Sequence, residues 1–241
     1  MLRAVDDPAV LGRLTRPLLG RLLARRGDAG AAQVLDRAWD VAVRADAVIA
    51  LAPAGLAKVE WAWLRADIAL ASPQIEVLLA RTGTPGTVRW RGELLRYMSR
   101  AGLPAAPFDG CAEEFAAGLR GDWQAAAMAW RRIGDPYEEA LELIGSGEPD
   151  TLIAGLATLD RLGATEPARF ARQRLRDLGH TRVPRGPAAA IQSNPAGLTD
   201  RQLDVLALLA DGLTNAEIGE RLAVSTRPWT ITCRPSSPSS A

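Results

Sequence analysis

The stretch GLTDRQLDVLALLADGLTNAEIGERLAVS, residues 197–225, predicts two short helices joined by a tight turn. Thr199 is placed to cap the first helix, and Gln202, three residues later, completes a capping box. One face of this helix is apolar at helical spacing, and it is formed by Leu203, Leu206, Ala207 and Ala210. Gly212 is expected to end the helix, because glycine readily adopts the left-handed conformation that follows a helix C-terminus.

A second helix is predicted after this turn. Thr214 or Asn215 is expected to cap it, since both side chains can accept a hydrogen bond from a backbone N–H of the first turn. Ile218 and Leu222 lie four residues apart, so both can pack back onto the first helix. Two short helices joined in this way are the first half of a helix-turn-helix unit.

The sequence of this stretch resembles the LuxR-type DNA-binding domain. The resemblance lies in the pattern VL.LLA.GLTNAEI..RL.VS, which is preceded by LT and an arginine. Gln202 stands where the family usually has Glu, and Gly219 stands where it usually has Ala. The resemblance implies sequence-specific DNA binding in the control of transcription. It also implies contacts to DNA phosphates, which we carry over to Thr214, Asn215, Ser225, Thr226 and Arg227.

The chain departs from the family after this point, where residues 226–241 read TRPWTITCRPSSPSSA. In the family a third helix enters the major groove and a fourth helix packs against it. Pro235 and Pro238 exclude a helix interior, at a cost of about 3 kcal/mol each, and the Ser/Pro run is typical of disorder. We therefore expect the third and fourth helices to be missing or disrupted. We hypothesise that a frameshift caused this departure. If the codons are read in a shifted frame from Pro228 onward, they can encode a sequence that resembles the family's third helix.

The composition sets broad limits on the rest of the protein. The chain has 241 residues, 48% of them hydrophobic, and a net charge of +1, so it can bury a core but shows no whole-chain attraction to nucleic acid. Cys111 and Cys233 favour a reducing compartment over a disulfide framework or a zinc site. No apolar run reaches the roughly 18 residues of a membrane span, and the N-terminus lacks a signal-peptide core. We expect a cytoplasmic protein without a membrane partner.

Residues 6–177 read as a succession of helices separated by short breaks rich in Gly, Pro and Asp. The pattern is interrupted at Pro53 and Gly55, and the helix that starts at Val59 is expected to end near Ser72 and Pro73. The other apolar runs cover residues 10–23, 31–42, 75–80, 88–98, 111–119, 123–133, 137–144, 152–162 and 167–178. No segment alternates with a period of two, so strands are not expected. Short helices in pairs predict an all-α, tetratricopeptide-like solenoid of helical hairpins.

The segment 119–126, LRGDWQAA, is predicted to be the joint between two such helices. Its glycine allows the turn, Asp122 caps the following helix, and Trp123 is expected to fill the seam between hairpins. The sequence AWRRIGDPYEEAL at 129–141 resembles a W..LG.PYE.AL phrase late in large ATP-dependent LuxR-type regulators, and 162–164 and 183–187 follow in the same order.

This wider resemblance covers about residues 59–225. Regulators of this class also carry an N-terminal ATPase module, but no G-x-x-x-x-G-K-[ST] motif occurs here. We therefore expect the chain to correspond to the back end of a longer regulator, truncated at both ends. The expected divisions are a helical-repeat region at 1–178, a Pro/Gly linker at 179–196, a partial helix-turn-helix at 197–227 and a disordered tail at 228–241.

The sequence contains no catalytic constellation, so we predict no enzyme, no cofactor and no metal site. His180, the only histidine, is interpreted as part of a helix end. The acidic segment at Asp135 and 138–142 is interpreted as the capped, solvated start of a helix. Four arginines could approach DNA phosphates beside the helix-turn-helix at 197–227, which we call the head, although a solvated helix is the simpler interpretation. They are Arg169, Arg172, Arg174 and Arg176.

The predicted partner is DNA, and a groove in the repeats could take a protein or small-molecule effector that the sequence does not identify. The oligomeric state is left open. Two alternative interpretations remain, a helical-repeat interaction scaffold and a non-functional gene fragment.

Overall fold

The described part of the chain is entirely helical. The computed structural model describes residues 8–184, 186 and 200–222, and these ranges contain no strand. The α-helices are α1 (Pro8–Arg26), α2 (Ala31–Ala45), α3 (Val48–Leu64), α4 (Ser72–Arg81), α5 (Val88–Arg100), α6 (Glu113–Leu119), α7 (Trp123–Ile133), α8 (Pro136–Gly145), α9 (Pro149–Arg161), α10 (Thr165–Asp177), α12 (Asp200–Ala210) and α13 (Asn215–Arg221). Two 3-10 helices, η1 (Ile68–Ala71) and η2 (Pro85–Thr87), precede α4 and α5. The prediction of an all-α protein is confirmed.

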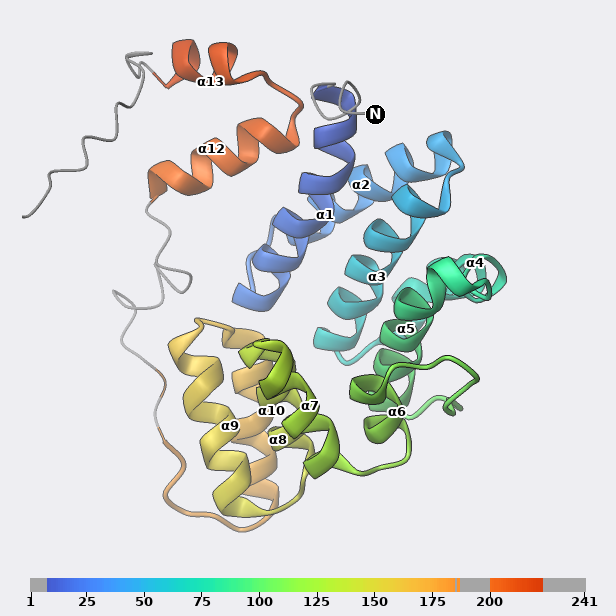
Figure 1. Cartoon of the computed structure of the whole chain (residues 1–241). Helices are drawn as coiled ribbons and strands as arrows, with labels where there is room; N and C mark the ends of the chain where they lie inside the picture. Colours follow the sequence, from blue (N-terminus) through green and yellow to red (C-terminus); the bar gives the residue numbers. More distant parts are fainter. Residues whose placement is uncertain (1–7, 185, 187–199, 223–241) are drawn as a thin grey trace, which may run out of the picture.

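The helices pack mainly against their neighbours along the chain (Figure 1). α1, α2 and α3 contact one another, α3 then contacts α4 and α5, and α6 to α10 continue as successive packed pairs. α1 departs from this order, because it also packs against α10 and against α12. The first helix therefore touches elements that lie more than 100 residues further along the chain.

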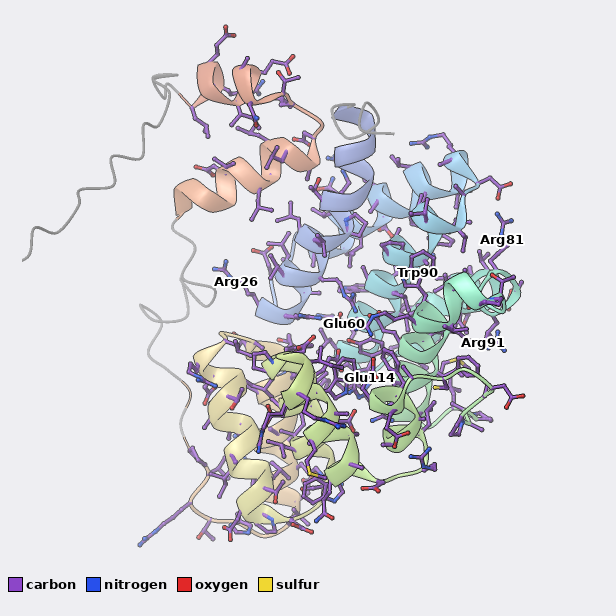
Figure 2. The ribbon with its side chains drawn as sticks, in the orientation of Figure 1. Arg26, Glu60, Arg81, Trp90, Arg91 and Glu114 are labelled. Atoms are coloured by element: carbon purple, nitrogen blue, oxygen red, sulfur yellow. The ribbon has the colours of Figure 1, made fainter. Side chains whose placement is uncertain are left out.

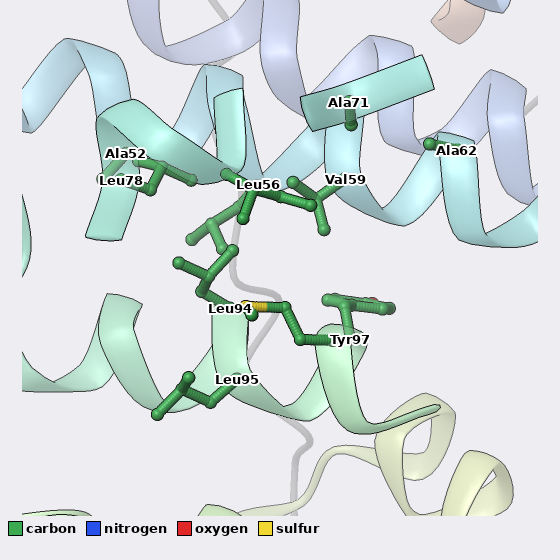
Figure 3. Close-up of a cluster of buried hydrophobic side chains, with 11 residues drawn as sticks. Ala52, Leu56, Val59, Ala62, Ala71, Leu78, Leu94, Leu95 and Tyr97 are labelled. Carbon is green, nitrogen blue, oxygen red and sulfur yellow. The ribbon is translucent and has the colours of Figure 1, made fainter. Parts of the chain in front are cut away.

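Two apolar clusters hold this arrangement together. In the first, Leu94 and Tyr97 of α5 face Leu56 and Val59 of α3 (Figure 3). The second joins α8, α9 and α10. Leu141 and Ile144 of α8 belong to it, together with fully buried leucines of α9 and α10, which are Leu152, Leu156, Leu159 and Leu175. Trp63 packs against both clusters, so the C-terminal end of α3 connects the two cores.

The predicted interruption at Pro53 and Gly55 is wrong, because α3 runs unbroken from Val48 to Leu64. Most side chains of this helix are buried, so packing outweighs the local cost of a proline and a glycine. Gly55 serves close packing: a Cβ at this position would lie 3.0 Å from Leu78 Cδ1 and 3.1 Å from Trp39 Cζ3.

The predicted end near Ser72 and Pro73 is also wrong. The helix ends at Leu64, and Ala66 takes a positive φ of 56° that turns the chain. Pro73 instead lies in the first turn of α4. A proline is well tolerated there, because the first N–H groups of a helix have no intrahelical partner.

The predicted joint at 119–126 is confirmed in its turn and its cap. Gly121 has a φ of 83°, and the Asp122 carboxylate accepts a hydrogen bond of 3.0 Å from the Ala125 N–H. The prediction for Trp123 is wrong, since this side chain is half-buried beside a cavity. The seam is filled by Trp130, which is 2% exposed and meets Phe115 edge-on at 5.2 Å between ring centroids.

A buried carboxylate, Glu60 of α3, lies at the centre of the molecule (Figure 2). It accepts hydrogen bonds from Arg21 and Arg25 of α1, the latter at 2.6 Å, and from the Tyr137 hydroxyl of α8 at 2.8 Å. The Arg25 guanidinium also lies 3.6 Å from the Tyr137 ring centroid. Burial alone would raise the pKa of Glu60, but the two arginines hold it well below the usual range. This ionised group therefore joins α1 and α8 to α3.

A second ionic cluster overturns the interpretation of residues 138–142 as a solvated surface. Glu142 is 3% exposed and accepts from Arg96 at 2.7 Å and from Arg100 at 2.9 Å. Glu138 accepts from Arg100 at 2.9 Å, and burial raises its pKa against the opposing effect of Arg100. Asp135 does cap α8, as predicted, by accepting from the Glu138 N–H at 3.0 Å. The acidic face points inward because α5 presents two arginines to it.

The predicted linker begins as a packed segment. The Pro184 carbonyl accepts a hydrogen bond of 3.0 Å from Arg172 Nε, and Val183 packs against the apolar cluster of α8 to α10. Residues 187–199 and the predicted tail at 228–241 lie outside the described residues. Within the described ranges, no helix has the length and apolar character needed to cross a membrane.

Candidate DNA-binding site

The first helix of the predicted head is α12, and its end is formed as the sequence indicates. Gly212 has a φ of 84°, which suits a residue without a side chain. Its N–H donates to the Leu209 carbonyl at 3.0 Å, and the Leu213 N–H donates to the Leu208 carbonyl at 3.1 Å. These bonds satisfy carbonyls at the C-terminus of α12 and turn the chain into the next helix. Thr199, the predicted cap at the other end, lies outside the described residues.

Thr214 caps the second helix, α13, through a reciprocal capping box with Glu217. The Thr214 N–H and hydroxyl each donate to the Glu217 carboxylate at 2.7 Å, and the Glu217 N–H donates back to the hydroxyl at 3.4 Å. The bonds from the Thr214 hydroxyl and N–H lower the pKa of Glu217. Of the two predicted caps, Thr214 is therefore correct, and Asn215 is the first residue of α13.

α13 packs back onto α12, which fixes the angle of the turn. Ile218 is 7% exposed and Ala210 is 2% exposed, so both of these predicted apolar positions are buried. Leu222, the other predicted contact, is half-buried directly after α13. The described head is thus two helices joined by a turn, with one buried residue on each helix.

The five residues predicted to contact DNA are only partly described. Thr214 and Asn215 are exposed at the start of α13, whereas Ser225, Thr226 and Arg227 lie outside the described residues, as do the positions of the predicted third and fourth helices. The Thr214 hydroxyl is already occupied by Glu217. Asn215 is exposed in the first helical turn of α13.

The two described helices of the head are acidic. Residues 200–222 contain Asp200, Asp204, Asp211, Glu217 and Glu220 against Arg201 and Arg221. Such a balance repels DNA phosphates, so any strong electrostatic attraction must come from outside this segment.

The head rests on the N-terminal helix. α12 packs along α1 (Figure 1), and Arg16 Nη2 lies 3.7 Å from Asp211 Oδ1. Nothing in the sequence of either helix indicated this contact, because it joins residues almost 200 positions apart. The head and the repeats therefore share one packed surface in addition to their covalent connection.

Residues 196–231 match the family model described as bacterial regulatory proteins, luxR family. This segment is a LuxR-family helix-turn-helix domain. The match covers α12, the turn at Gly212 and α13, and it supports a DNA-binding regulator of transcription. No curated protein and no solved structure matches the chain significantly.

The arginines of α10 are not a free basic face beside the LuxR-family domain. Arg172 Nη2 donates to both carboxylate oxygens of Asp160, at 2.6 and 2.7 Å. Arg169 pairs with Glu166 at 2.9 Å, and Arg176 donates to Gln173 at 3.2 Å. Arg174 instead lines a cavity in the repeats. Three of the four guanidiniums thus have partners within the protein.

The described residues contain no group of three or more His, Cys, Asp or Glu suited to holding a metal ion. His180 follows α10, and its backbone N–H donates to the Leu175 carbonyl at 3.0 Å. Cys111 is a free thiol, and burial raises its pKa.

The capping box makes a local prediction for the LuxR-family domain. Thr214→Ala removes the hydroxyl that bonds Glu217, and we expect it to destabilise α13 by about 1 kcal/mol. Amide exchange of Ile218 should then accelerate about five-fold, whereas Thr214→Ser, which keeps the hydroxyl, should change it little. Asn215→Ala is the control, since Asn215 makes no cap. Equal exchange rates in all three variants would show that the cap does not stabilise α13.

Proposed function

We propose that this protein is a LuxR-type regulator of transcription whose helical repeats, residues 1–178, support a DNA-binding head at residues 197–227. The observation that carries the proposal is the LuxR-family match at 196–231 together with the turn and cap that join α12 to α13. In a helix-turn-helix unit these two helices place the segment that follows them against DNA. The remaining divisions, the linker at 179–196 and the tail at 228–241, belong to the same proposal.

We infer further that this chain binds DNA weakly, with strong salt dependence and little sequence preference. Base contacts specify a site, whereas phosphate contacts only position the protein. The sequence of residues 226–241, with Pro235 and Pro238, lacks the pattern of the family's third helix, and the described head is acidic. The phosphate contacts are assigned to Asn215, Ser225, Thr226 and Arg227, with Thr214 holding α13 in place.

Fluorescence anisotropy with labelled duplexes of several unrelated sequences tests this function. We expect dissociation constants of about 10⁻⁴–10⁻⁶ M near physiological salt, as for non-specific binding, with much tighter binding at about 50 mM salt. The constants for different sequences should agree within a few-fold. Tight binding to one sequence in physiological salt would refute the loss of base reading, and no binding at low salt would refute the DNA-binding function itself.

A matched pair of variants locates the DNA contacts. Arg227→Gln should weaken binding to all duplexes alike and reduce the slope of log affinity against log salt by about one. Arg132→Gln removes the same charge from an exposed position on α7, away from the head, and should leave both quantities unchanged. If the two variants behave alike, the contact is not made through residue 227.

The wider assignment, to the large ATP-dependent class of LuxR-type regulators, remains part of this proposal. It is supported by the order of the elements, in which packed helical pairs precede the head, and by the phrase at 129–141, which spans the end of α7 and the start of α8.

A further inference from the structure

The head has too little core of its own to explain why its helices are folded. α12 has 11 residues and α13 has 7, and helices shorter than about 12–15 residues are marginal in water unless packing supports them. Within residues 204–222, whose side chains the structure describes, only Ala210 and Ile218 are buried. Segments well below about 40 residues rarely bury enough surface to fold alone. The two helices therefore need a packing partner outside the head.

The sequence after α13 does not indicate this partner. In the family a third and a fourth helix follow, but residues 226–241 include Pro235 and Pro238 and lack that pattern. The apolar residues of α12 are nonetheless shielded from water, because every residue from 205 to 209 is half-buried. Five consecutive residues extend around the whole circumference of a helix with 3.6 residues per turn. α12 is thus covered on more than one side.

α1 supplies this cover (Figure 1). It packs against α12 much more extensively than α13 does. α1 is itself held in place, because it packs against α2, α3 and α10, and because Arg21 and Arg25 bond the buried carboxylate of Glu60. A surface that is already fixed lowers the entropic cost of ordering a short helix against it.

α1 and the head carry opposite charges. α1 contains five arginines and no acidic residue, whereas residues 200–222 contain five acidic residues and two arginines, a balance of −3. The two surfaces meet at an ion pair in which Arg16 Nη2 lies 3.7 Å from Asp211 Oδ1, directly after α12. Charge complementarity of this kind favours one pairing of surfaces and one orientation over others.

We propose that α1 takes the place of the family's third and fourth helices as the packing partner of α12, so that the head is folded only while it is docked on α1. α13 is then supported indirectly, because it packs on α12, which packs on α1. Undocking melts both helices of the head together. The proposal concerns the folding of the head and does not require DNA binding, so it is tested without DNA.

Docking can be measured in the full chain with a nitroxide on α1. Leu18→Cys, with Cys111 and Cys233 replaced by serine, places the label two residues from Arg16. Leu18 is 56% exposed, so the label does not replace a buried side chain. It should broaden the amide signals of α12 in ¹⁵N-labelled protein. Mixing nitroxide-labelled chains without ¹⁵N and ¹⁵N-labelled chains without nitroxide should produce no broadening; broadening there would mean that α1 of a second copy covers α12, and docking within one chain would be wrong.

Folding of the head is measured separately, by amide exchange of Leu208 in α12 and Ile218 in α13. Arg16→Glu replaces attraction to Asp211 by repulsion, so the broadening of α12 should decrease. Exchange of both amides should accelerate by the same factor, about three-fold or more, because the two helices open as one unit.

Three controls accompany this variant. Arg132→Glu makes the same change of charge at an exposed position of α7 and should alter neither the broadening nor the exchange. Asp211→Arg in the Arg16→Glu background restores opposite charges and should restore both quantities. The Leu156 amide of α9 should exchange at an unchanged rate, because the repeats stay folded.

The decisive outcome is a separation of the two measurements. If Arg16→Glu relieves the broadening but leaves exchange of Leu208 and Ile218 unchanged, the head folds by itself and the proposal is wrong. An equal acceleration at Leu156 would show that α1 supports the repeats and not the head in particular. No change in broadening or exchange would show that the contact at Arg16 does not hold the head.

Discussion

Glu60→Gln should lower the stability of the folded protein by about 3–5 kcal/mol, the cost of leaving buried cations without their counter-charge. Arg25 would lose its only described carboxylate partner, and Arg21 would keep only Glu93. For a chain of this size, such a loss corresponds to a decrease in Tm of about 10 °C. Thermal unfolding followed by circular dichroism measures it directly.

Glu139→Gln is the matched control, since it removes a carboxylate from an exposed ion pair. Its partner, Arg131, is 69% exposed, so water screens the interaction and we expect a loss below about 1 kcal/mol. If both variants unfold at the same temperature, the buried network does not stabilise the fold more than a surface pair does.

The pH dependence gives a second test of Glu60. Its pKa is lowered on folding, so its contribution is fully present above the pKa of the unfolded carboxyl group, about 4.3, and is lost as the pH falls further. The difference in Tm between the wild-type protein and Glu60→Gln should therefore narrow from pH 7 toward pH 3.5. A difference that stays constant over this range would mean that the charge of Glu60 is not what stabilises the protein.

Gly92→Ala should destabilise the protein by about 1–3 kcal/mol, although alanine is the better helix former. A Cβ at this position of α5 would lie 2.6 Å from Cδ2 and 2.9 Å from Cγ of Phe115. Phe115 cannot move aside easily, because it is 3% exposed and packs edge-on against Trp130. Overpacking therefore outweighs the gain in helix propensity, and chemical denaturation should show a lower midpoint.

Gly145→Ala is the control for this effect, since a Cβ there would have no atom within 4 Å. It should leave stability unchanged or raise it by up to about 0.5–1 kcal/mol. In a Phe115→Ala background the cost of Gly92→Ala should largely disappear, because the clashing ring is gone. A cost that persists in this background would place the strain elsewhere than at Phe115.

Much of the helical architecture was predictable because its signals are local. The bounds of α7 and α8 follow from apolar spacing, a capping aspartate and a glycine within a few residues of one another. The turn at Gly212 and the cap at Thr214 are local in the same sense. The interruption predicted within α3 failed because burial of the whole helix outweighed two unfavourable residues.

The cavity of the repeats was not predictable in its chemistry. It is lined by Arg96 and Arg100 of α5 and by Arg174 of α10. Arg96 and Arg174 are more than 70 residues apart in the sequence, and no sequence pattern links them. One signal for the buried network was present, a lone carboxylate at Glu60 within the apolar run of α3. An ionised group in such a run requires a buried partner, but its identity depends on which helices pack against it.

The sequence by itself determined most of the helices, the caps at Asp122, Asp135 and Thr214, and the LuxR-type turn, because each rests on interactions between residues a few positions apart. Only the tertiary structure decided which charges are buried together and where the head lies. Glu60 meets Arg25 from 35 residues away and Tyr137 from 77, and α12 rests on α1 across almost the whole chain. Such pairings arise when helix faces pack, and the local pattern of each helix contains no information about its distant partner.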